Sequence, residues 1–311
     1  MQLHLLRCLG ARTQRAANRL VRPRQDGRAQ LAARGSAEGA GDGREAAVRL
    51  DRGRFLVAGG LDASLQSASG VFSLDPRSGR VRRLGQAAQA FHDAASAVIG
   101  GGLFIFGGGS ATSIDTVQNF DLARHTTAVV GRLPQPLSDL TAVSSGGTVY
   151  LIGGYDGKTA RAEVYSTTDG VSYRTLALLP LGLRYAAVAF AAGRIVIAGG
   201  VTDVGVVSTV LVLDPRTGRV SMLGHLPAPL GHASALALGG EVYIFGGRST
   251  SGTATSDITR VDPVSGSIAP VGRLPQPIAD AAAVETGPHS GMLIGGWRNH
   301  AVAQVVTVRT H

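Results

Sequence analysis

Short apolar runs that each end in a pair of glycines recur along the chain. The runs are rich in β-branched or aromatic residues and are bounded by glycine, which is typical of buried β-strands. They cover residues 55–58, 103–106, 149–152, 195–198, 242–245 and 292–294. The glycine pairs begin at Gly59, Gly107, Gly153, Gly199, Gly246 and Gly295, which gives successive spacings of 48, 46, 46, 47 and 49 residues.

Further strands flank each run and complete a repeating unit. A short apolar segment precedes every run, and glycine turns such as Gly146-Gly147 join the two into a hairpin. A third strand follows the glycine pair and ends in turns such as Asp214-Pro215-Arg216-Thr217-Gly218, where proline presets the turn and glycine supplies positive φ. A fourth strand comes next, as at residues 219–223. Each unit therefore predicts four antiparallel strands.

Six such units predict a closed ring of sheets. A single twisted four-stranded sheet cannot bury both of its faces, so it must pack between neighbours. The sequence thus predicts an all-β, six-bladed β-propeller with four antiparallel strands per blade. The blades are expected at approximately residues 44–85, 91–131, 138–177, 184–224, 231–272 and 280–311.

The units resemble kelch repeats. The apolar run before Gly-Gly, the preceding hairpin and the period near fifty residues carry this resemblance over roughly residues 44–311. Kelch repeats usually place a tyrosine and a tryptophan at set distances after the glycine pair, whereas here Phe120 and Tyr165 are scattered and Trp297 is the single tryptophan. The units look most like divergent bacterial kelch proteins, often described as galactose-oxidase-like, many of which are exported.

The sixth unit stops at His311 without an outermost strand, so we expect the other terminus to supply it. Counting back from Gly59 points to residues 30–36 as the closing strand. Residues 1–43 otherwise form a basic N-terminal segment that we expect to be poorly ordered. For residues 1–28, a transit-like segment and a nucleic-acid-binding arm are alternatives to the flexible tail, or wrongly assigned start, that we favour.

Composition and charge exclude several classes of protein. Residues 1–54 hold 12 of the 30 basic and 5 of the 21 acidic residues, so the remainder, with 18 against 16, is nearly neutral and is not expected to bind nucleic acid. Cys8 is the single cysteine, which leaves no disulfide and no cysteine-based site in the blades. No run of eighteen apolar residues predicts a membrane span, and His4 and Arg7 interrupt any signal peptide.

One polar column stands out when the units are aligned on their glycine pairs. Fourteen residues before the pair lie Glu45, Asp93, Asp139, Tyr185 and His232, with Asp280 equivalent after a short insertion. The residues immediately before the column add Arg44, His92 and Arg184. Because these positions begin the innermost strand of each blade, we predict that they surround one mouth of the central channel, where they would bind a ligand.

Two interpretations of this column stay open. Close carboxylates raise one another's pKa and attract cations, so the ring could hold a metal, a sugar or a basic group, or perform acid–base chemistry. Alternatively, acidic side chains could accept backbone N–H bonds and lock blade to blade. Tyr185 and His232 break the acidic pattern and are therefore the better candidates for function.

The loops after the glycine pairs should lie on the same face as the column. They differ from unit to unit, and variable loops on a rigid scaffold are where recognition resides. The candidate contact residues in these loops are Tyr155, Arg248, Trp297 and Arg298. An aromatic and guanidinium pair such as Trp297 with Arg298 suits stacking on a sugar or a peptide side chain, or packing at the rim.

These features favour a non-catalytic, monomeric binding scaffold that recognises a protein or a glycan through one face. No cofactor, metal or catalytic residue is expected. A galactose-oxidase-like copper enzyme would need a cysteine-linked tyrosine, and Cys8 lies outside the blades. The alternative is a sugar-modifying enzyme that resembles kelch-type sialic acid epimerases and acts at the channel mouth, where Arg44, Glu45, Arg184, Tyr185 and His232 could serve.

Overall fold

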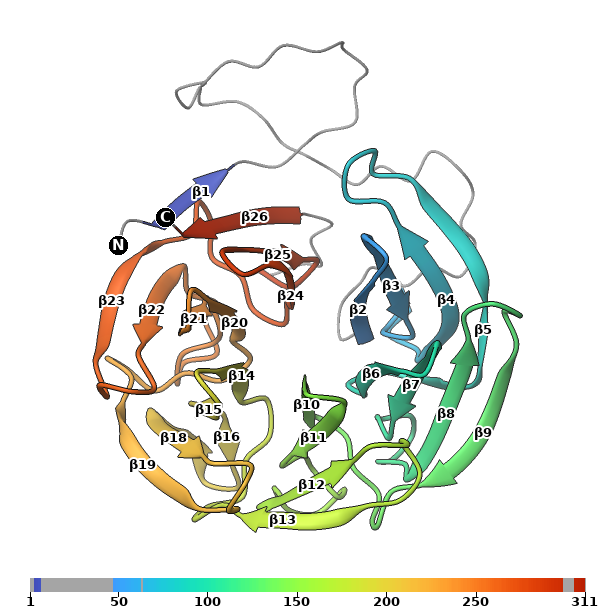
Figure 1. Cartoon of the computed structure of the whole chain (residues 1–311), viewed down its shortest axis with the longest axis horizontal. Coiled ribbons are helices and arrows are strands. Elements are labelled where there is room, and N and C mark those ends of the chain that lie inside the picture. Colours follow the sequence, from blue (N-terminus) through green and yellow to red (C-terminus); the bar gives the residue numbers. More distant parts are fainter. Residues whose placement is uncertain (1–2, 7–46, 63, 299–304, 311) are drawn as a thin grey trace.

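A computed structural model describes residues 3–6, 47–62, 64–298 and 305–310. Six four-stranded sheets stand as blades around a central opening (Figure 1). The prediction of an all-β, six-bladed propeller with four antiparallel strands per blade is confirmed. A seventh, two-stranded sheet joins β16 (Val201–Thr202) to β17 (Gly205–Val206) in the fourth blade. No helix in this part of the chain is long and apolar enough to cross a membrane.

The inner half of each blade is a tight hairpin. The innermost strands are β2 (Ala47–Asp51), β6 (Ala95–Ile99), β10 (Thr141–Ser145), β14 (Ala187–Ala191), β20 (Ser234–Leu238) and β24 (Ala282–Gly287). Their partners are β3 (Arg54–Ala58), β7 (Gly102–Phe106), β11 (Thr148–Ile152), β15 (Arg194–Ala198), β21 (Glu241–Phe245) and β25 (Ser290–Ile294). The partners are the predicted apolar runs, and their side chains are mostly buried.

The outer half of each blade consists of a third strand, which is largely buried in most blades, and an outermost strand, which is more exposed. The third strands are β4 (Ala68–Leu74), β8 (Thr116–Asp121), β12 (Glu163–Thr167), β18 (Thr209–Leu213), β22 (Asp257–Val261) and β26 (Val305–Thr310). The outermost are β5 (Val81–Phe91), β9 (Thr127–Arg132), β13 (Arg174–Leu178), β19 (Val220–His225), β23 (Ile268–Arg273) and β1 (Leu3–Leu6).

The core lies between blades. Each cluster of buried side chains draws on two neighbouring sheets, as where Leu56 of the first blade packs with Ile105 of the second. Equivalent clusters join the second blade to the third, the third to the fourth, and so on to the sixth and the first. A blade therefore buries both of its faces only inside the ring, which explains why the units repeat.

The glycine pairs bring neighbouring blades together. The amide of Gly154 donates to the carbonyl oxygen of Leu183, which belongs to the connection into the next blade, at 2.8 Å. Gly153 has a φ of 60°, and a Cβ at this residue would overlap that same oxygen. Only glycine suits a positive φ beneath such a close backbone approach. A Cβ at Gly107, Gly199 or Gly246 would overlap the equivalent oxygen, of Leu137, Leu230 or Ile278, in the connection into the next blade.

The N-terminus closes the ring, but the closing strand lies earlier in the chain than the segment predicted from the sequence. β1 pairs antiparallel with β26, with Leu3 opposite Thr310 and Leu6 opposite Thr307, so it forms the outer strand of the sixth blade. Residues 30–36, the predicted closing strand, lie outside the described residues, as does most of the predicted basic segment. The apolar stretch at the very start of the chain was the signal that the count from Gly59 missed.

Candidate functional site

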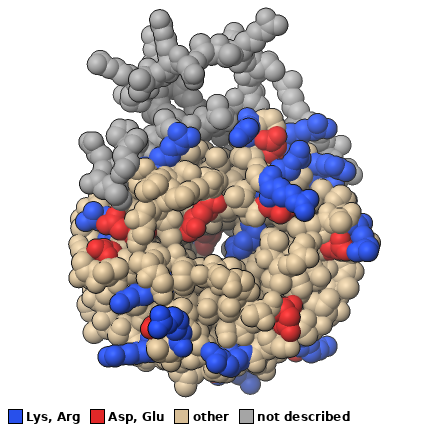
Figure 2. Space-filling model, in the orientation of Figure 1, with Lys and Arg blue, Asp and Glu red and all other residues tan. Residues whose placement is uncertain are grey.

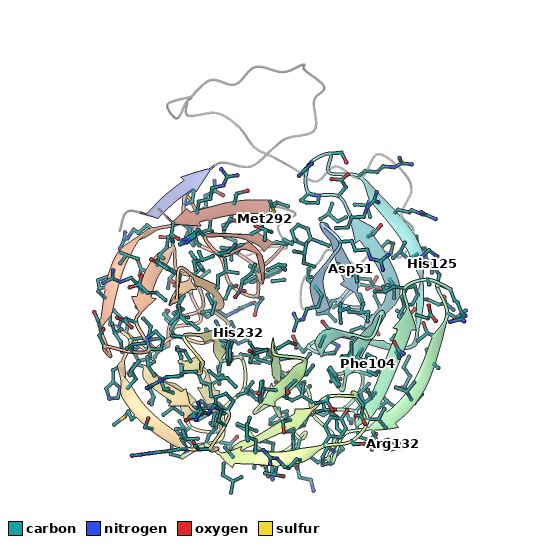
Figure 3. All side chains as sticks on the ribbon, viewed as in Figure 1. Asp51, Phe104, His125, Arg132, His232 and Met292 are labelled. Atoms are coloured by element: carbon teal, nitrogen blue, oxygen red, sulfur yellow. The ribbon has the colours of Figure 1, made fainter. Side chains whose placement is uncertain are left out.

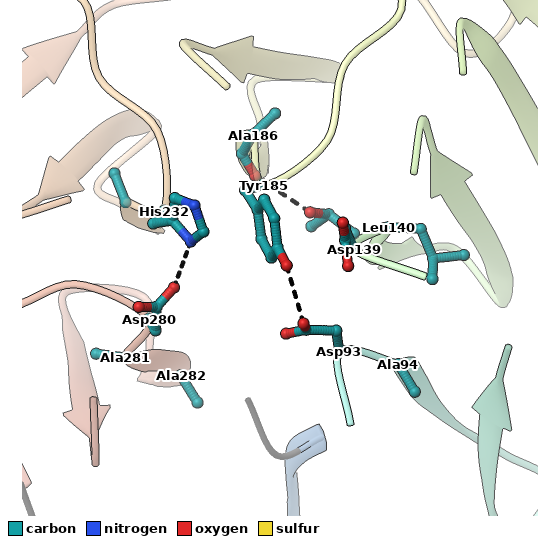
Figure 4. Close-up of a pocket in the computed structure, with 12 residues that line it drawn as sticks. Asp93, Ala94, Asp139, Leu140, Tyr185, Ala186, His232, Asp280, Ala281 and Ala282 are labelled. Carbon is teal, nitrogen blue, oxygen red and sulfur yellow. Dashed lines mark hydrogen bonds and ion pairs between the residues drawn. The ribbon is translucent and has the colours of Figure 1, made fainter. Parts of the chain in front are cut away.

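Five residues of the predicted polar column line one mouth of the central opening. Each stands two positions before an innermost strand, and together they surround a hollow of about 160 Å³ (Figure 4). The residues that follow them are mostly small, which leaves the hollow open. The five are Asp93, Asp139, Tyr185, His232 and Asp280. Arg44 and Glu45, the first-blade members of the prediction, lie outside the described residues.

The backbone of the column forms a chain of hydrogen bonds from blade to blade. The amide of Asp139 donates to the carbonyl of Asp93, and that of Tyr185 to Asp139, at 2.9 and 3.1 Å. His232 and Asp280 continue the series, each at 3.0 Å from the preceding carbonyl. All five residues have φ between 51° and 58°, in the left-handed region. Main-chain groups therefore make this link between blades.

This geometry separates the two interpretations of the column. The left-handed region is entered by asparagine, aspartate and histidine far more readily than by other residues, so backbone conformation accounts for part of the residue choice. It does not account for Tyr185, because a bulky residue is strained there. Since the backbone makes the blade-to-blade bonds, the side chains are available to face the hollow, and a strained tyrosine indicates a further role for its ring.

His232, Asp280 and Arg248 form a buried charged group on the wall of the hollow. His232 Nδ1 lies 2.5 Å from Asp280 Oδ1, and Arg248 Nη2 donates to the other carboxylate oxygen at 2.7 Å. The Asp280 side chain is only 6% exposed. Burial would raise the pKa of Asp280, but the hydrogen bond from His232 and the charges of His232 and Arg248 hold it below its ordinary value.

The ionised Asp280 fixes the tautomer of His232. A carboxylate only accepts hydrogen bonds, so the proton of neutral His232 resides on Nδ1 and its Nε2 carries a lone pair. In the described part of the chain Nε2 has no hydrogen-bond partner. Figure 3 places His232 beside the central opening, whereas His125 and Arg132 lie at the outer rim. His232 therefore presents a proton acceptor that is oriented by a carboxylate.

Tyr185 packs against this imidazole and reaches across the mouth. Its ring stacks on His232 with centroids 3.9 Å apart, and its hydroxyl donates to Asp93 Oδ2 at 2.9 Å. Burial, with the nearby carboxylates of Asp93 and Asp139, raises the pKa of Tyr185 far above its ordinary value. The hydroxyl thus stays protonated and acts as a donor. The two residues that broke the acidic pattern are in direct contact.

Arg184 joins the mouth to the face loops. Its guanidinium lies 4.6 Å from the ring centre of Tyr155, and Nη1 lies 3.3 Å from Asp139 Oδ2. A backbone bridge between Arg184 and Val201 ties the same position to the β16–β17 hairpin. Tyr155 and Arg248 are bridged in the same way to Ser138 and Gly231. These loops therefore start on the mouth side of the ring.

Other predicted site residues lie apart from the hollow. His92 does not line it, and its Nδ1 lies 2.9 Å from the hydroxyl of Ser67. Burial lowers the pKa of His92, against the opposing charge of Asp139. Trp297 bridges Ala279 through its backbone, and Arg298 donates to Gln276. Neither Trp297 nor Arg298 lines the hollow.

The described site combines three carboxylates, a histidine, a tyrosine and two arginines. No group of three His, Cys, Asp or Glu side chains in the described ranges is arranged to hold a metal ion. A protein cavity of about 150 Å³ can hold benzene, so a hollow of about 160 Å³ admits a group of about that size. Donors, acceptors and a stacked aromatic pair around such a space suit a hydroxylated ligand.

Sequence reasoning missed one charged residue of the opening. Arg49 on β2 extends across to the third blade, where Nη2 donates to the carbonyl of Ala142 at 3.1 Å. A signal was present, since the equivalent positions of the other innermost strands are all apolar: Ala97, Val143, Ala189, Leu236 and Val284. Figure 2 shows basic and acidic side chains at the wall of the opening.

Comparisons with known proteins agree with the fold. Residues 136–171, in the third blade, match the Kelch motif. Kelch-like protein 35 of Mus musculus is 28% identical over 173 residues, which cover 54% of this chain and 29% of that protein. The chain thus matches less than a third of the length of this relative. A solved structure described as "Structure of YjhT" superposes with a TM-score of 0.73 at 16% identity, covering 86% of this chain and 97% of that one.

The fold and the mouth define a six-bladed β-propeller with a polar site at one end of its central opening. The chain is a kelch-motif β-propeller, as the glycine pairs and the period of the sequence suggested. Its likeness to the solved structure, at 16% identity, concerns the fold.

Proposed function

We propose that the chain is a sugar-modifying enzyme that binds a monosaccharide in the mouth hollow and moves protons on it. The observation that carries this proposal is the His232–Asp280 pair, in which a buried carboxylate binds Nδ1 of a histidine that lines the hollow and leaves Nε2 as a base. A histidine oriented by a carboxylate is the usual device for general acid–base catalysis. The resemblance to kelch-type sialic acid epimerases favours a sugar as the substrate.

The simplest reaction for this site is isomerisation at the anomeric carbon. His232 Nε2 takes the proton of the anomeric hydroxyl while the bond between that carbon and the ring oxygen breaks. The imidazolium, stabilised by Asp280, then returns the proton to the released ring oxygen. After the carbonyl group has turned over, the same transfers run in reverse: His232 takes the proton from that oxygen as it attacks the other face, and gives it to the carbonyl oxygen, which becomes the new anomeric hydroxyl. One group that both accepts and donates a proton balances the reaction. Arg184 keeps further N–H donors for the sugar hydroxyls, and the Tyr185 oxygen, whose own proton goes to Asp93, can accept a hydrogen bond from one of them.

Recognition of a protein or a glycan without catalysis is the second candidate function. It is favoured by the β16–β17 hairpin, which only the fourth blade carries among the described residues. Val204 at the tip of this hairpin is 97% exposed. An exposed apolar tip beside a polar mouth suits contact with a larger partner. The two functions would use the same face of the ring.

The direct test is to follow anomer equilibration by proton NMR. Freshly dissolved sialic acid, glucuronate, glucose and galactose are each monitored with and without the protein. We expect at least one sugar to equilibrate faster, and His232→Asn to lose about 100-fold or more of that acceleration. His225→Asn, on the outer strand β19, is the matched control and should retain it. No acceleration with any sugar, or full activity in His232→Asn, would leave recognition as the better account.

A further inference from the structure

Arg49 occupies an unusual position in the wall of the central opening. It lies on an innermost strand, is partly buried, and makes two hydrogen bonds in the described structure: Nη1 to Val48 O at 2.7 Å and Nη2 to Ala142 O at 3.1 Å. A guanidinium has five N–H donors, so three are left. No carboxylate among the described residues forms an ion pair with Arg49, in contrast to Arg184 and Arg248 at the mouth.

The direction of the side chain follows from the register of the sheets. Arg49 pairs with Leu56 and Ser96 pairs with Ile105, and cross-strand partners lie on the same face of a sheet. Leu56 and Ile105 pack together between the first and second blades. Arg49 and Ser96 therefore both face this interface, one from each side.

Ser96, on the opposite side of this interface, carries a buried hydroxyl. Its side chain is 1% exposed, and its hydroxyl oxygen has no hydrogen-bond partner. Buried hydroxyls usually have a hydrogen-bond partner, so this one is available to a bound ion. An anion would satisfy both groups at once, because a guanidinium and a hydroxyl are each hydrogen-bond donors.

The hydrogen bond from Arg49 to the carbonyl of Ala142 shows where the guanidinium lies along the central opening. β10 is the edge strand of its sheet, so the oxygen of Ala142 that is left for Arg49 points into the opening. Ala142 directly follows Thr141, which lines the mouth hollow. The guanidinium thus lies just below the hollow. Because burial without a counter-charge disfavours the cation, the pKa of Arg49 is lowered to about 10.

We propose that the central opening holds a small anion, a halide or a carboxylate group, against the guanidinium of Arg49 and the hydroxyl of Ser96. The site lies below the mouth and does not depend on any catalytic role of His232. A free anion would act as a structural counter-ion for the ring. The carboxylate of an acidic ligand seated in the hollow would reach the same donors from above.

Chloride-35 NMR tests this proposal on the full chain, because chloride that exchanges with a protein site has a broadened resonance. We expect saturable broadening that weakens by about tenfold or more in Arg49→Gln, the effect of losing a charge-assisted hydrogen bond. Arg132→Gln is the matched control, since Arg132 pairs with Asp115 on the outer rim (Figure 3) and should leave the broadening unchanged. Formate that displaces chloride identifies a free-anion site. Displacement by glucuronate, but not by formate or glucose, identifies the carboxylate of a mouth ligand.

A second measurement keeps the test decisive if Arg49→Gln fails to fold. Crystals of the unmodified protein grown in bromide should give an anomalous peak beside the Arg49 guanidinium. A chloride resonance that is equally broad for the wild type, Arg49→Gln and buffer, or bromide peaks confined to the outer rim, would overturn the proposal.

Discussion

His232 and Asp280 stand at equivalent positions of consecutive blades and are joined twice. The amide of Asp280 donates to the carbonyl of His232 at 3.0 Å, and the side chains meet through Nδ1 and Oδ1 at 2.5 Å. The backbone bond belongs to the series that links the blades, whereas the side-chain bond occurs at one junction of the described column. The same two residues therefore serve the architecture through their main chains and the chemistry through their side chains.

Asp280→Asn should destabilise the protein at neutral pH. The substitution leaves Arg248 without its carboxylate and replaces a charged acceptor of His232 with a neutral one, and loss of one partner of a buried pair costs about 3 kcal/mol. Urea unfolding at pH 7 measures this change. Asp257→Asn is the matched control, because its ion pair with Arg273 is well exposed and should contribute less than about 1 kcal/mol.

The penalty of Asp280→Asn should disappear in acid. The pKa of Asp280 is lowered in the folded protein, so its carboxylate stabilises the fold above the unfolded value of about 3.9, and this contribution is lost as pH falls through the folded pKa. Urea unfolding of both proteins between pH 7 and pH 2 should show two curves that converge in acid. Curves that stay parallel to pH 2 would contradict the proposed charge interaction.

Asp139 offers a test of the left-handed backbone. Its φ is 58°, which asparagine tolerates and a β-branched residue does not. Asp139→Asn and Asp139→Val both remove the charge that pairs with Arg184, so their difference reflects the backbone preference together with any hydrogen bond that the Asn side chain keeps. We expect Asp139→Val to be less stable than Asp139→Asn by about 1–2 kcal/mol in urea unfolding. Equal stabilities would mean that the column residues are chosen for their side chains only.

Much of the fold could be predicted from the sequence because its physical cause is repeated. Glycine pairs recur in all six units, and the first glycine of five pairs lies in a close approach to the connection into the next blade. The closing strand was different. Leu3–Leu6 belongs to no repeat, and its pairing with β26 depends on contacts between the two ends of the chain, which periodicity does not encode.

The site could be predicted in position but not in pairing. Alignment on the glycine pairs brought Asp93, Asp139, Tyr185, His232 and Asp280 together, because equivalent residues of a ring must meet at one end. The partners of each side chain depend on rotamers, which a sequence pattern does not contain. The hydrogen bond that His92 makes with Ser67, away from the hollow, is one example. The contribution of the main chain to the column was not visible either.

Gly153→Ala should be among the most damaging single substitutions in the chain. An alanine Cβ would overlap the Leu183 carbonyl and must also adopt a φ of 60°. We expect a loss of about 3 kcal/mol or more, from overpacking together with left-handed strain. Gly147→Ala is the matched control, because its φ is 78° but nothing lies near its Cβ. Similar losses for both variants in urea unfolding would show that strain, and not the close approach between blades, explains the glycine pairs.

Deletion of residues 1–8 should destabilise the ring, whereas deletion of residues 30–36 should not. The first deletion removes β1, which pairs with β26 from Leu3 to Leu6. The edge of β26 then has no partner strand and is exposed. Because about 1 kcal/mol shifts the melting temperature of a protein of this size by roughly 2–4 °C, we expect a fall of about 4 °C or more. Differential scanning calorimetry compares the melting temperatures of the two shortened proteins, which lack segments of similar length. A fall caused by the loss of residues 30–36 alone would instead assign the closing strand to the segment that the repeat spacing indicated, and β1 would then have no role in holding the sixth blade.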